Sequence, residues 1–152
     1  MTNNFPYRRV LITGGSGFIG STLIRRLTKE KNLKIFNFDK RVDYSINFDF
    51  FDKTTYQYLS FNLNNVDEVN KAIKISDPEI IIHLAAESHV DRSIEGPEIF
   101  LESNVIGTFN LLQACTKYFL NSNKEIRDDF RFHHVSTDEV FGSLGETKLF
   151  SE

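Results

Sequence analysis

The feature that most constrains this fold is a set of three glycines, Gly14, Gly17 and Gly20, placed where the hydrophobic pattern changes. Residues 10–13 form a short apolar run typical of a buried parallel strand, and apolar residues recur at helical spacing from Phe18 onward. Glycines in such a turn let the chain bend tightly, let backbone N–H groups approach a pyrophosphate and let the helix pack on the strand. The pattern therefore predicts a dinucleotide site at the N-terminus of the first helix.

A carboxylate follows at a position suited to binding the adenosine ribose. Asp39 ends the predicted second strand, residues 33–38, nineteen residues after Gly20. Its side chain can accept hydrogen bonds from the ribose hydroxyls and would repel a 2′-phosphate. A glycine run alone is often a plain turn, but this context favours cofactor binding, with NAD preferred to NADP. Lys40 beside the carboxylate leaves that preference slightly open.

The rest of the chain alternates between strands and helices. Strands are predicted at residues 58–61, 79–83 and 130–136, helices at 18–27, from 66 up to Pro78 and at 96–119, and a polar loop at 121–129. Asn64 or Asn65 is expected to cap the second helix. The fold class is therefore α/β, a Rossmann-type doubly wound parallel sheet with helices on both faces. Ligands of such sheets bind beyond the carboxyl ends of the strands. Residues 1–8 are expected to be disordered.

Composition narrows the class of protein. The net charge is −3 and the basic residues are scattered, so we expect neither a nucleic-acid partner nor a membrane surface. Cys115, the single cysteine, fits a reducing compartment, and its place on an apolar helix face predicts packing, not nucleophilic chemistry. The first residues lack a signal-peptide pattern and no segment is long enough to span a bilayer, which predicts a cytoplasmic location. No metal site is predicted, because no Cys, His and Asp residues have metal-ligand spacing.

Two adjacent carboxylates, Asp138 and Glu139, follow the last predicted strand and come directly after Thr137. Like charges at close range push pKa values apart, so one carboxyl can stay protonated while its neighbour is ionised. Such a pair could supply an acid and a base for an elimination. Taken alone, the pair is more simply explained by a turn capped by Asp138 and a solvated Glu139.

The segment that follows the fourth predicted strand combines small and polar residues. Ala85 and Ala86 would allow close approach of a flat cofactor, and the polar residues after them could face a substrate. His83 could be a catalytic or metal-binding residue, but local hydrogen bonds are the more ordinary explanation for a histidine at a strand end. The same explanation is preferred for His133 and His134.

Four segments together, residues 13–20, 83–94, 103–108 and 130–142, resemble the dTDP-glucose 4,6-dehydratase family of extended short-chain dehydrogenase/reductases. The glycine turn is shared across that superfamily, whereas the second and fourth segments are more selective. Sugar epimerases of the superfamily usually lack the Asp-Glu pair. The resemblance implies an NAD-dependent lyase that oxidises a dTDP-sugar at C4, eliminates water across C5–C6 and returns the hydride to C6. It also implies a homodimer in the full-length enzyme.

The same resemblance implies roles for individual residues. Glu139 would remove the C5 proton, Asp138 would protonate the departing C6 hydroxyl and Thr137 would hydrogen-bond the C4 oxygen. Ser88 would contact the sugar or the nicotinamide, and Asn104 would support the substrate-binding face. The NAD site would be formed by Gly14, Gly17, Phe18, Ile19, Gly20, Asp39, Lys40, Asn62, Leu63, Leu84, Ala85, Ala86, Ser88 and Ser103.

The chain departs from the family pattern in three places. None of its five tyrosines is followed four residues later by lysine, so the family's Tyr-x-x-x-Lys motif is missing. We therefore expect residues 9–152 to be an incomplete NAD-binding Rossmann domain, the N-terminal part of a longer enzyme, inactive by itself. Asn62-Leu63 replaces the usual Asp-Ile in the adenosine pocket, and residues 41–56 do not match the family. With the tyrosine-bearing helix absent, Phe100, Leu111 and Phe119 are expected to be partly exposed.

Two other functions stay open. The chain could belong to a related UDP-sugar epimerase or decarboxylase. It could also be a catalytically dead NAD-binding module, which the missing tyrosine motif favours.

Overall fold

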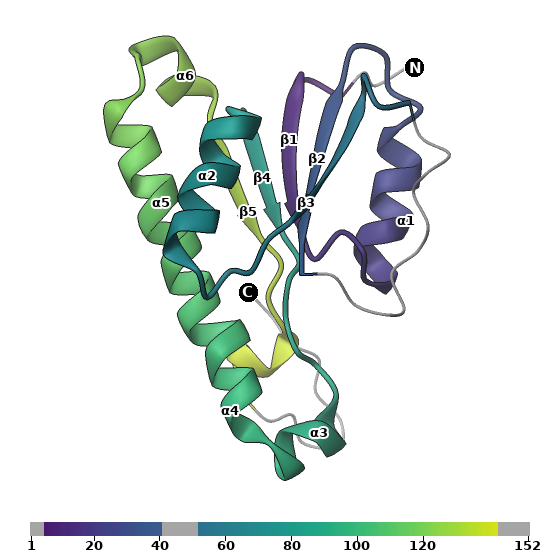
Figure 1. Ribbon diagram of the computed structural model, residues 1–152, viewed down its shortest axis with the longest axis vertical. Helices are drawn as coiled ribbons and strands as arrows, with labels where there is room; N and C mark the ends of the chain where they lie inside the picture. Colours follow the sequence, from purple (N-terminus) through teal and green to yellow (C-terminus); the bar gives the residue numbers. More distant parts are fainter. Residues whose placement is uncertain (1–4, 41–51, 143–152) are drawn as a thin grey trace.

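The computed structural model describes residues 5–40 and 52–142, whose five strands form one parallel sheet (Figure 1). The strands are β1 (Arg9–Thr13), β2 (Lys34–Asp39), β3 (Tyr56–Ser60), β4 (Ile80–His83) and β5 (Arg131–His134). They lie in the order β3-β2-β1-β4-β5, and every neighbouring pair is parallel. The chain builds outward from β1 on one side and then crosses to the other, so the order reverses beside β1. This confirms the predicted doubly wound α/β fold.

Helices cover both faces of this sheet (Figure 1). They are α1 (Phe18–Leu27), α2 (Val66–Ser76), α3 (Val90–Glu95), α4 (Pro97–Phe100), the π-helix η1 (Leu101–Gly107), α5 (Thr108–Asn121), α6 (Lys124–Asp129) and the 3-10 helix η2 (Asp138–Phe141). Successive side chains of a strand point to opposite faces. Leu11 of β1 accordingly joins the apolar cluster beneath α2 and α5, whereas Val10 and Ile12 join the cluster beneath α1. All three are fully buried, so β1 anchors both layers of the core.

The start of α2 shows how the sequence fixes a boundary. Asn65 is the N-cap, and its side chain accepts hydrogen bonds from the backbone N–H groups of Asp67 and Glu68 over 3.1 and 3.3 Å. The Glu68 carboxylate reaches back to the N–H of Asn62 over 2.6 Å. The two contacts of Asn65 satisfy N–H groups that a helix start leaves without partners, and the Glu68 contact ties the helix to the segment before it. Of the two asparagines that the sequence offered as caps, Asn65 is the one used.

Three predictions about helices need correction. The predicted polar loop at 121–129 is wrong, because residues 124–129 form α6, capped by Asn123, whose side chain accepts from the Ile126 N–H over 2.9 Å. The predicted helix at 96–119 begins one residue later, at Pro97, and reaches Asn121, and its first half contains the π-helix η1. Leu111 is fully buried in the core, contrary to the expected exposure, because α5 packs it toward α2 and the sheet.

Part of the predicted disordered start, residues 1–8, contacts the domain. The rings of Phe5 and Tyr7 meet edge-on with centroids 5.3 Å apart, and both pack against the cluster beneath α1. Residues 1–4, 41–51 and 143–152 lie outside the described residues. Among the described helices, none combines the length and the apolar character needed to cross a membrane.

Candidate dinucleotide-binding site

Two of the three glycines are required by the packing of the turn itself. Gly14 has a φ of +70°, and a Cβ built on it would lie 2.6 Å from the backbone nitrogen of Ala85. A Cβ on Gly20 would lie 2.3 Å from the carbonyl oxygen of Gly14. Both distances are shorter than any real Cβ contact, and both neighbours are backbone atoms that cannot move aside cheaply. Gly14 and Gly20 therefore let β1, the segment after β4 and α1 approach one another.

Gly17 differs, because its missing side chain leaves room at the surface. A Cβ on Gly17 would meet only the carbonyl oxygen of Gly14, at 3.2 Å, within a 4 Å radius. Gly17 is the N-cap of α1, and no side chain caps that helix. The next residues, Phe18 and Ile19, are 91% and 62% exposed although both are apolar. The result is an open cradle at a helix N-terminus, where backbone N–H groups and the helix dipole favour a phosphate group.

Asp39 presents its carboxylate to the same turn. The N–H of Ser16 donates to Asp39 Oδ2 over 2.8 Å, and the Tyr58 hydroxyl donates to the Asp39 carbonyl oxygen over 3.1 Å. Burial raises the pKa of the Asp39 carboxyl above its ordinary value, while the hydrogen bonds from Ser16 and the charge of Lys40 oppose that shift. An ionised carboxylate has several lone pairs, so Asp39 can accept hydrogen bonds from a ligand while it holds Ser16.

One buried polar residue beneath the glycine turn, Asn37, was not predicted from the sequence. Asn37 is fully buried in β2, and its Nδ2 donates to Ser16 Oγ over 3.2 Å and to the Tyr56 hydroxyl over 3.0 Å. Its Oδ1 has no hydrogen-bond partner among the described residues and lies where a Cβ of Gly15 would point. Ser16 is thus hydrogen-bonded twice, through its hydroxyl to Asn37 and through its backbone N–H to Asp39. The available signal was a polar residue inside the otherwise apolar run at 35–38.

The segment after β4 borders the turn on its other side. Leu84 and Ala85 are partly buried, whereas Ala86 and Ser88 are exposed. Because the Ala85 backbone lies against Gly14, the structure brings the paired alanines to the glycine turn.

Asn104 in η1 fixes the continuation of this segment by its side chain. Its Oδ1 accepts from the Glu87 N–H and its Nδ2 donates to the Glu87 carbonyl oxygen, each over 2.8 Å. Ser103, its neighbour, is partly buried. Asn104 therefore contacts the segment after β4 directly.

His83 is a buried structural residue, as the sequence suggested. Its Nδ1 lies 2.6 Å from Thr13 Oγ1, and its Nε2 lies 2.9 Å from Thr108 Oγ1. Burial, together with the nearby His134 ring stacked at 5.1 Å, lowers the pKa of His83 to about 4. A neutral imidazole with both nitrogens engaged joins β1, β4 and α5. His133 and His134 are both exposed.

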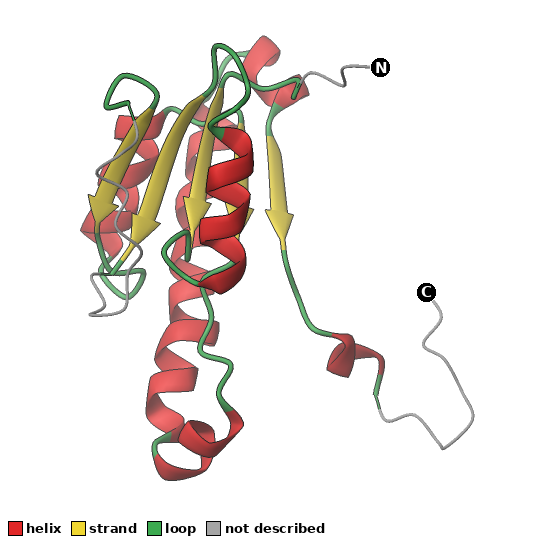
Figure 2. Cartoon of the chain, turned by 90° about the vertical axis from the view of Figure 1, so that its right-hand side faces the viewer, coloured by secondary structure: helices red, strands yellow, loops and turns green. Residues whose placement is uncertain are grey.

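The three predicted catalytic residues follow β5 at the carboxyl side of the sheet. Figure 2 shows η2 beyond the arrowhead of β5, on the side where all the strands end. Thr137 is the N-cap of η2, and its Oγ1 accepts from the Glu139 N–H at 3.4 Å. Thr137, Asp138 and Glu139 are all exposed. The cap is therefore Thr137 rather than Asp138, and both carboxylates are open to a ligand.

Comparison with known proteins decides the family. The sequence model described as GDP-mannose 4,6 dehydratase matches residues 11–152. This chain belongs to the GDP-mannose 4,6 dehydratase family. A dTDP-glucose 4,6-dehydratase of Salmonella typhimurium is 40% identical over 140 residues, which cover 90% of this chain and 38% of that protein. The chain thus spans about two fifths of the length of the curated relatives that it matches.

Solved structures of family relatives have the same fold. A dTDP-glucose 4,6-dehydratase from Bacillus anthracis, in complex with NAD, matches with a TM-score of 0.72 at 35% identity, over 94% of this chain and 42% of that one. A UDP-glucose 4-epimerase from Thermus thermophilus, also in complex with NAD, matches with a TM-score of 0.64 at 32% identity, over 72% of this chain and 34% of that one. The resemblance to dTDP-glucose 4,6-dehydratases is confirmed.

Two of the residues expected in the adenosine pocket of this chain are already engaged. Asn62 is exposed, but its Oδ1 accepts from the Asn64 N–H over 3.0 Å. Leu63 is 7% exposed and belongs to the core, where a Cβ on Gly107 would lie 2.9 Å from its Cβ. The structure therefore leaves the Asn62 amide, more than the Leu63 side chain, accessible to a ligand.

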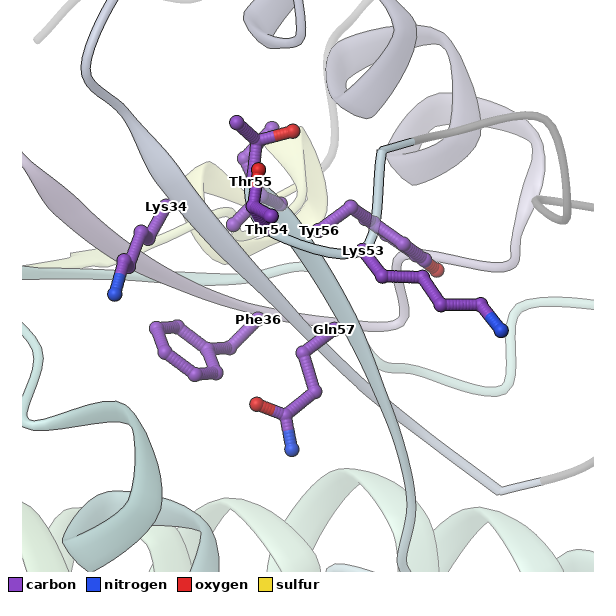
Figure 3. A pocket seen from close by; sticks show the side chains of 8 residues that line it. Lys34, Phe36, Lys53, Thr54, Thr55, Tyr56 and Gln57 are labelled. Atoms are coloured by element: carbon purple, nitrogen blue, oxygen red, sulfur yellow. The ribbon is translucent and has the colours of Figure 1, made fainter.

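One pocket of this family member lies away from the glycine turn. A cavity of about 400 Å³ is lined by residues 34–36 and 53–57, with Lys34, Lys53 and Gln57 around it (Figure 3). These residues stand at the starts of β2 and β3, at the edge of a parallel sheet opposite to the carboxyl ends. The cavity is therefore separate from the candidate site.

Within the described part of the chain, no group of three or more His, Cys, Asp or Glu residues could hold a metal ion.

Proposed function

We propose that this chain is the NAD-binding portion of a dTDP-glucose 4,6-dehydratase. The observation that carries the proposal is the 2.8 Å hydrogen bond from the Ser16 N–H to the Asp39 carboxylate. It fixes an anionic acceptor for ribose hydroxyls beside the N-terminus of α1, which has no side-chain cap and whose first N–H groups suit a pyrophosphate. The relatives from B. anthracis and T. thermophilus, both complexed with NAD, support the assignment.

The residues present fit NAD in three respects. The space above Gly17 accommodates a backbone-bound phosphate, the N-terminus of α1 has no side-chain cap, and Asp39 would repel the 2′-phosphate of NADP. Phe18 and Ile19 would contact the dinucleotide, which accounts for their exposure. When bound, NAD would take a hydride from C4 of the sugar and later return it to C6.

We propose that the acid and the base for the elimination step are Asp138 and Glu139. Glu139 takes the C5 proton, the C5–H electron pair forms the C5=C6 double bond, and the C6–O bond breaks. Asp138 gives its proton to the departing hydroxyl, which leaves as water. Thr137, which already contacts the Glu139 N–H, would hydrogen-bond the C4 oxygen. Ser88 and Asn104 would border the substrate, a dTDP-sugar. An epimerase has no elimination to carry out, so this pair favours the dehydratase over the UDP-sugar alternative.

The proposal includes a homodimer for the longer enzyme. Apolar side chains stand exposed along the length of η1 and α5, among them Leu101 at 60%, Val105 at 55% and Phe109 at 56%. Exposed apolar surface on this scale is typical of an interface between chains or helices. By itself the chain should bind NAD without turnover, since no tyrosine is followed four residues later by lysine.

Calorimetric titration with NAD tests the binding proposal. We expect a dissociation constant in the millimolar range or below for the wild-type chain. Asp39→Asn should weaken binding by roughly tenfold, because a hydrogen bond to a charged acceptor contributes about 1.5 kcal/mol or more. Asp128→Asn is the matched control, since Asp128 is exposed and lies in α6, away from the carboxyl ends of the strands. Absence of millimolar binding by the wild type would contradict the proposed function.

A chimera tests the chemistry. This chain would be joined to the part of the S. typhimurium relative that it does not match, and dTDP-glucose and UDP-sugars would be assayed side by side. Turnover of dTDP-glucose is expected, and Glu139→Gln should abolish water loss while NAD stays bound. Glu125→Gln, an exposed carboxylate in α6, is the control. Full activity of the Glu139→Gln chimera would refute the assignment of the base.

A further inference from the structure

Lys40 and Glu87 form an ion pair that spans the carboxyl end of β1. Lys40 directly follows β2, Glu87 lies four residues after β4, and β1 runs between those two strands. Neighbouring strands are about 4.8 Å apart, so the ends of β2 and β4 are separated by roughly 10 Å. The two side chains close this gap, with Lys40 Nζ 3.0 Å from Glu87 Oε1. The cation is therefore drawn from the Asp39 side of the site toward β4.

Glu87 is the fixed member of this pair. Its backbone N–H and carbonyl oxygen are both hydrogen-bonded to the Asn104 side chain, each over 2.8 Å. The side chain of Glu87 is 20% exposed, compared with 51% for Lys40. A long, solvated lysine has many alternative positions, whereas Glu87 is held in place by η1. The position of the Lys40 charge therefore depends on Glu87.

We propose that Glu87 strengthens the preference for NAD over NADP by holding Lys40 away from the adenosine ribose. The proposal rests on the proposed function, because it assumes that the glycine turn and Asp39 bind a dinucleotide. Lys40 is near enough to matter, since its charge lowers the pKa of the Asp39 carboxyl against the larger, opposite effect of burial. An untethered lysine beside the ribose would attract a 2′-phosphate. Selectivity would then arise from Asp39, which repels that phosphate, and from Glu87, which occupies the nearest cation.

The test is a double-mutant cycle on the NADP-to-NAD affinity ratio. Dissociation constants for NAD and for NADP would be measured by calorimetry at one ionic strength for the wild type, Glu87→Gln, Lys40→Gln and the double variant. Taking the ratio cancels effects on the pyrophosphate, which both dinucleotides share. Glu30→Gln is the matched control, because Glu30 also has a 20% exposed side chain paired with a cation, Arg26, but follows the far end of α1.

We expect Glu87→Gln to raise the relative affinity for NADP by about threefold to fivefold, the range of a partly exposed ion pair. The gain should vanish in the Lys40→Gln, Glu87→Gln double variant and be absent in Glu30→Gln. Glu87→Asp, which keeps a carboxylate, should retain most of the wild-type ratio and guards against a purely structural effect of the glutamine.

Two results would overturn the proposal while leaving NAD binding intact. One is an unchanged ratio in Glu87→Gln, and the other is a gain that persists without Lys40, which would indicate a general effect of removing one negative charge. A wild-type chain that binds neither dinucleotide would instead refute the proposed function, and this proposal with it.

Discussion

The His83 ring and the Thr13 hydroxyl lie 2.6 Å apart on neighbouring central strands, and the two residues are register partners in the β1–β4 ladder. This contact places a neutral histidine inside the sheet, directly below the residues that border the candidate site. The imidazole reaches α5 as well, through Thr108 at 2.9 Å. Any proton added to this ring must therefore disturb contacts between three elements of the fold.

Acid should destabilise the protein through His83. The pKa of His83 is lowered from 6.5 to about 4 by burial and by the nearby His134, so the unfolded chain binds the proton more readily than the folded one. The stability from this residue is fully present above pH 6.5 and is lost as the pH falls toward 4, by a total of about 3 kcal/mol. Urea unfolding across this range should show the loss in the wild type and a smaller one in His83→Gln. His133→Gln, an exposed control, should behave like the wild type. Equal pH slopes for the wild type and His83→Gln would contradict this account.

Asp39 should act in the opposite direction. Burial raises its pKa above the value of 3.8 that it has in an unfolded chain, so the folded state favours the protonated carboxyl. The contribution of Asp39 to stability is present below that value and is lost as the pH rises through the raised pKa. At neutral pH Asp39→Asn should therefore be more stable than the wild type, and the difference should shrink in acid. Thermal unfolding of both proteins at about pH 7 and pH 4 measures it. A variant less stable than the wild type at neutral pH would show that the Ser16 contact outweighs burial.

Alanine substitutions should separate the two roles of the glycines. Gly20→Ala places a Cβ 2.3 Å from the Gly14 carbonyl oxygen and should cost more than about 3 kcal/mol of unfolding free energy. Gly17 has an ordinary φ of −76° and a nearest contact at 3.2 Å, so Gly17→Ala should change stability by no more than about 1 kcal/mol. It should nevertheless weaken NAD binding more than tenfold, because the methyl group fills the cradle. Chemical unfolding and calorimetry on both variants test this. Normal NAD affinity in Gly17→Ala would place the phosphates elsewhere.

The Cys115 thiol should be unreactive in the folded protein. Cys115 is 5% exposed in the cluster beneath α2 and α5, and burial raises the pKa of its thiol to about 12. The thiolate, which is the reactive form, is therefore scarce as well as shielded. A chromogenic disulfide reagent at about pH 8 should react only as fast as the protein opens, and at the rate of a free thiol in denaturant. Fast labelling under native conditions would show that α5 detaches from the sheet.

Much of this site could be predicted because its signals are local in the sequence. Gly14, Gly17 and Gly20 lie within one turn, and Asp39 marks the end of an apolar strand. Parallel strands bring their carboxyl ends to one edge, so the placement of the glycine turn and of Glu139 at that edge followed from the alternation of strands and helices. His83 and Cys115 were correctly expected to be structural residues for the same kind of reason.

The contacts that escaped prediction join residues that are distant in the sequence. Lys40 pairs with Glu87 across 47 positions, and Asn37 bonds to Ser16 across 21. Hydrophobic periodicity fixes which face a side chain occupies but carries no information on its polar partner across the sheet. Helix α6 was not predicted for another reason, because its six residues are rich in charge and form no apolar face that the pattern could reveal.

The wide turn of η1 sets the direction in which the Asn104 side chain points. Asn104 lies within η1 (Leu101–Gly107). The direction in which its side chain leaves the helix axis therefore depends on how the residues between it and α5 are wound. Regular α-helical winding with the same number of residues would rotate the chain further at each step and would turn Asn104 away from its present direction. The amide would then face away from Glu87, and the loop after β4 would lose its support. The contact with Glu87 therefore depends on the wide winding of η1 as much as on the amide of Asn104 itself.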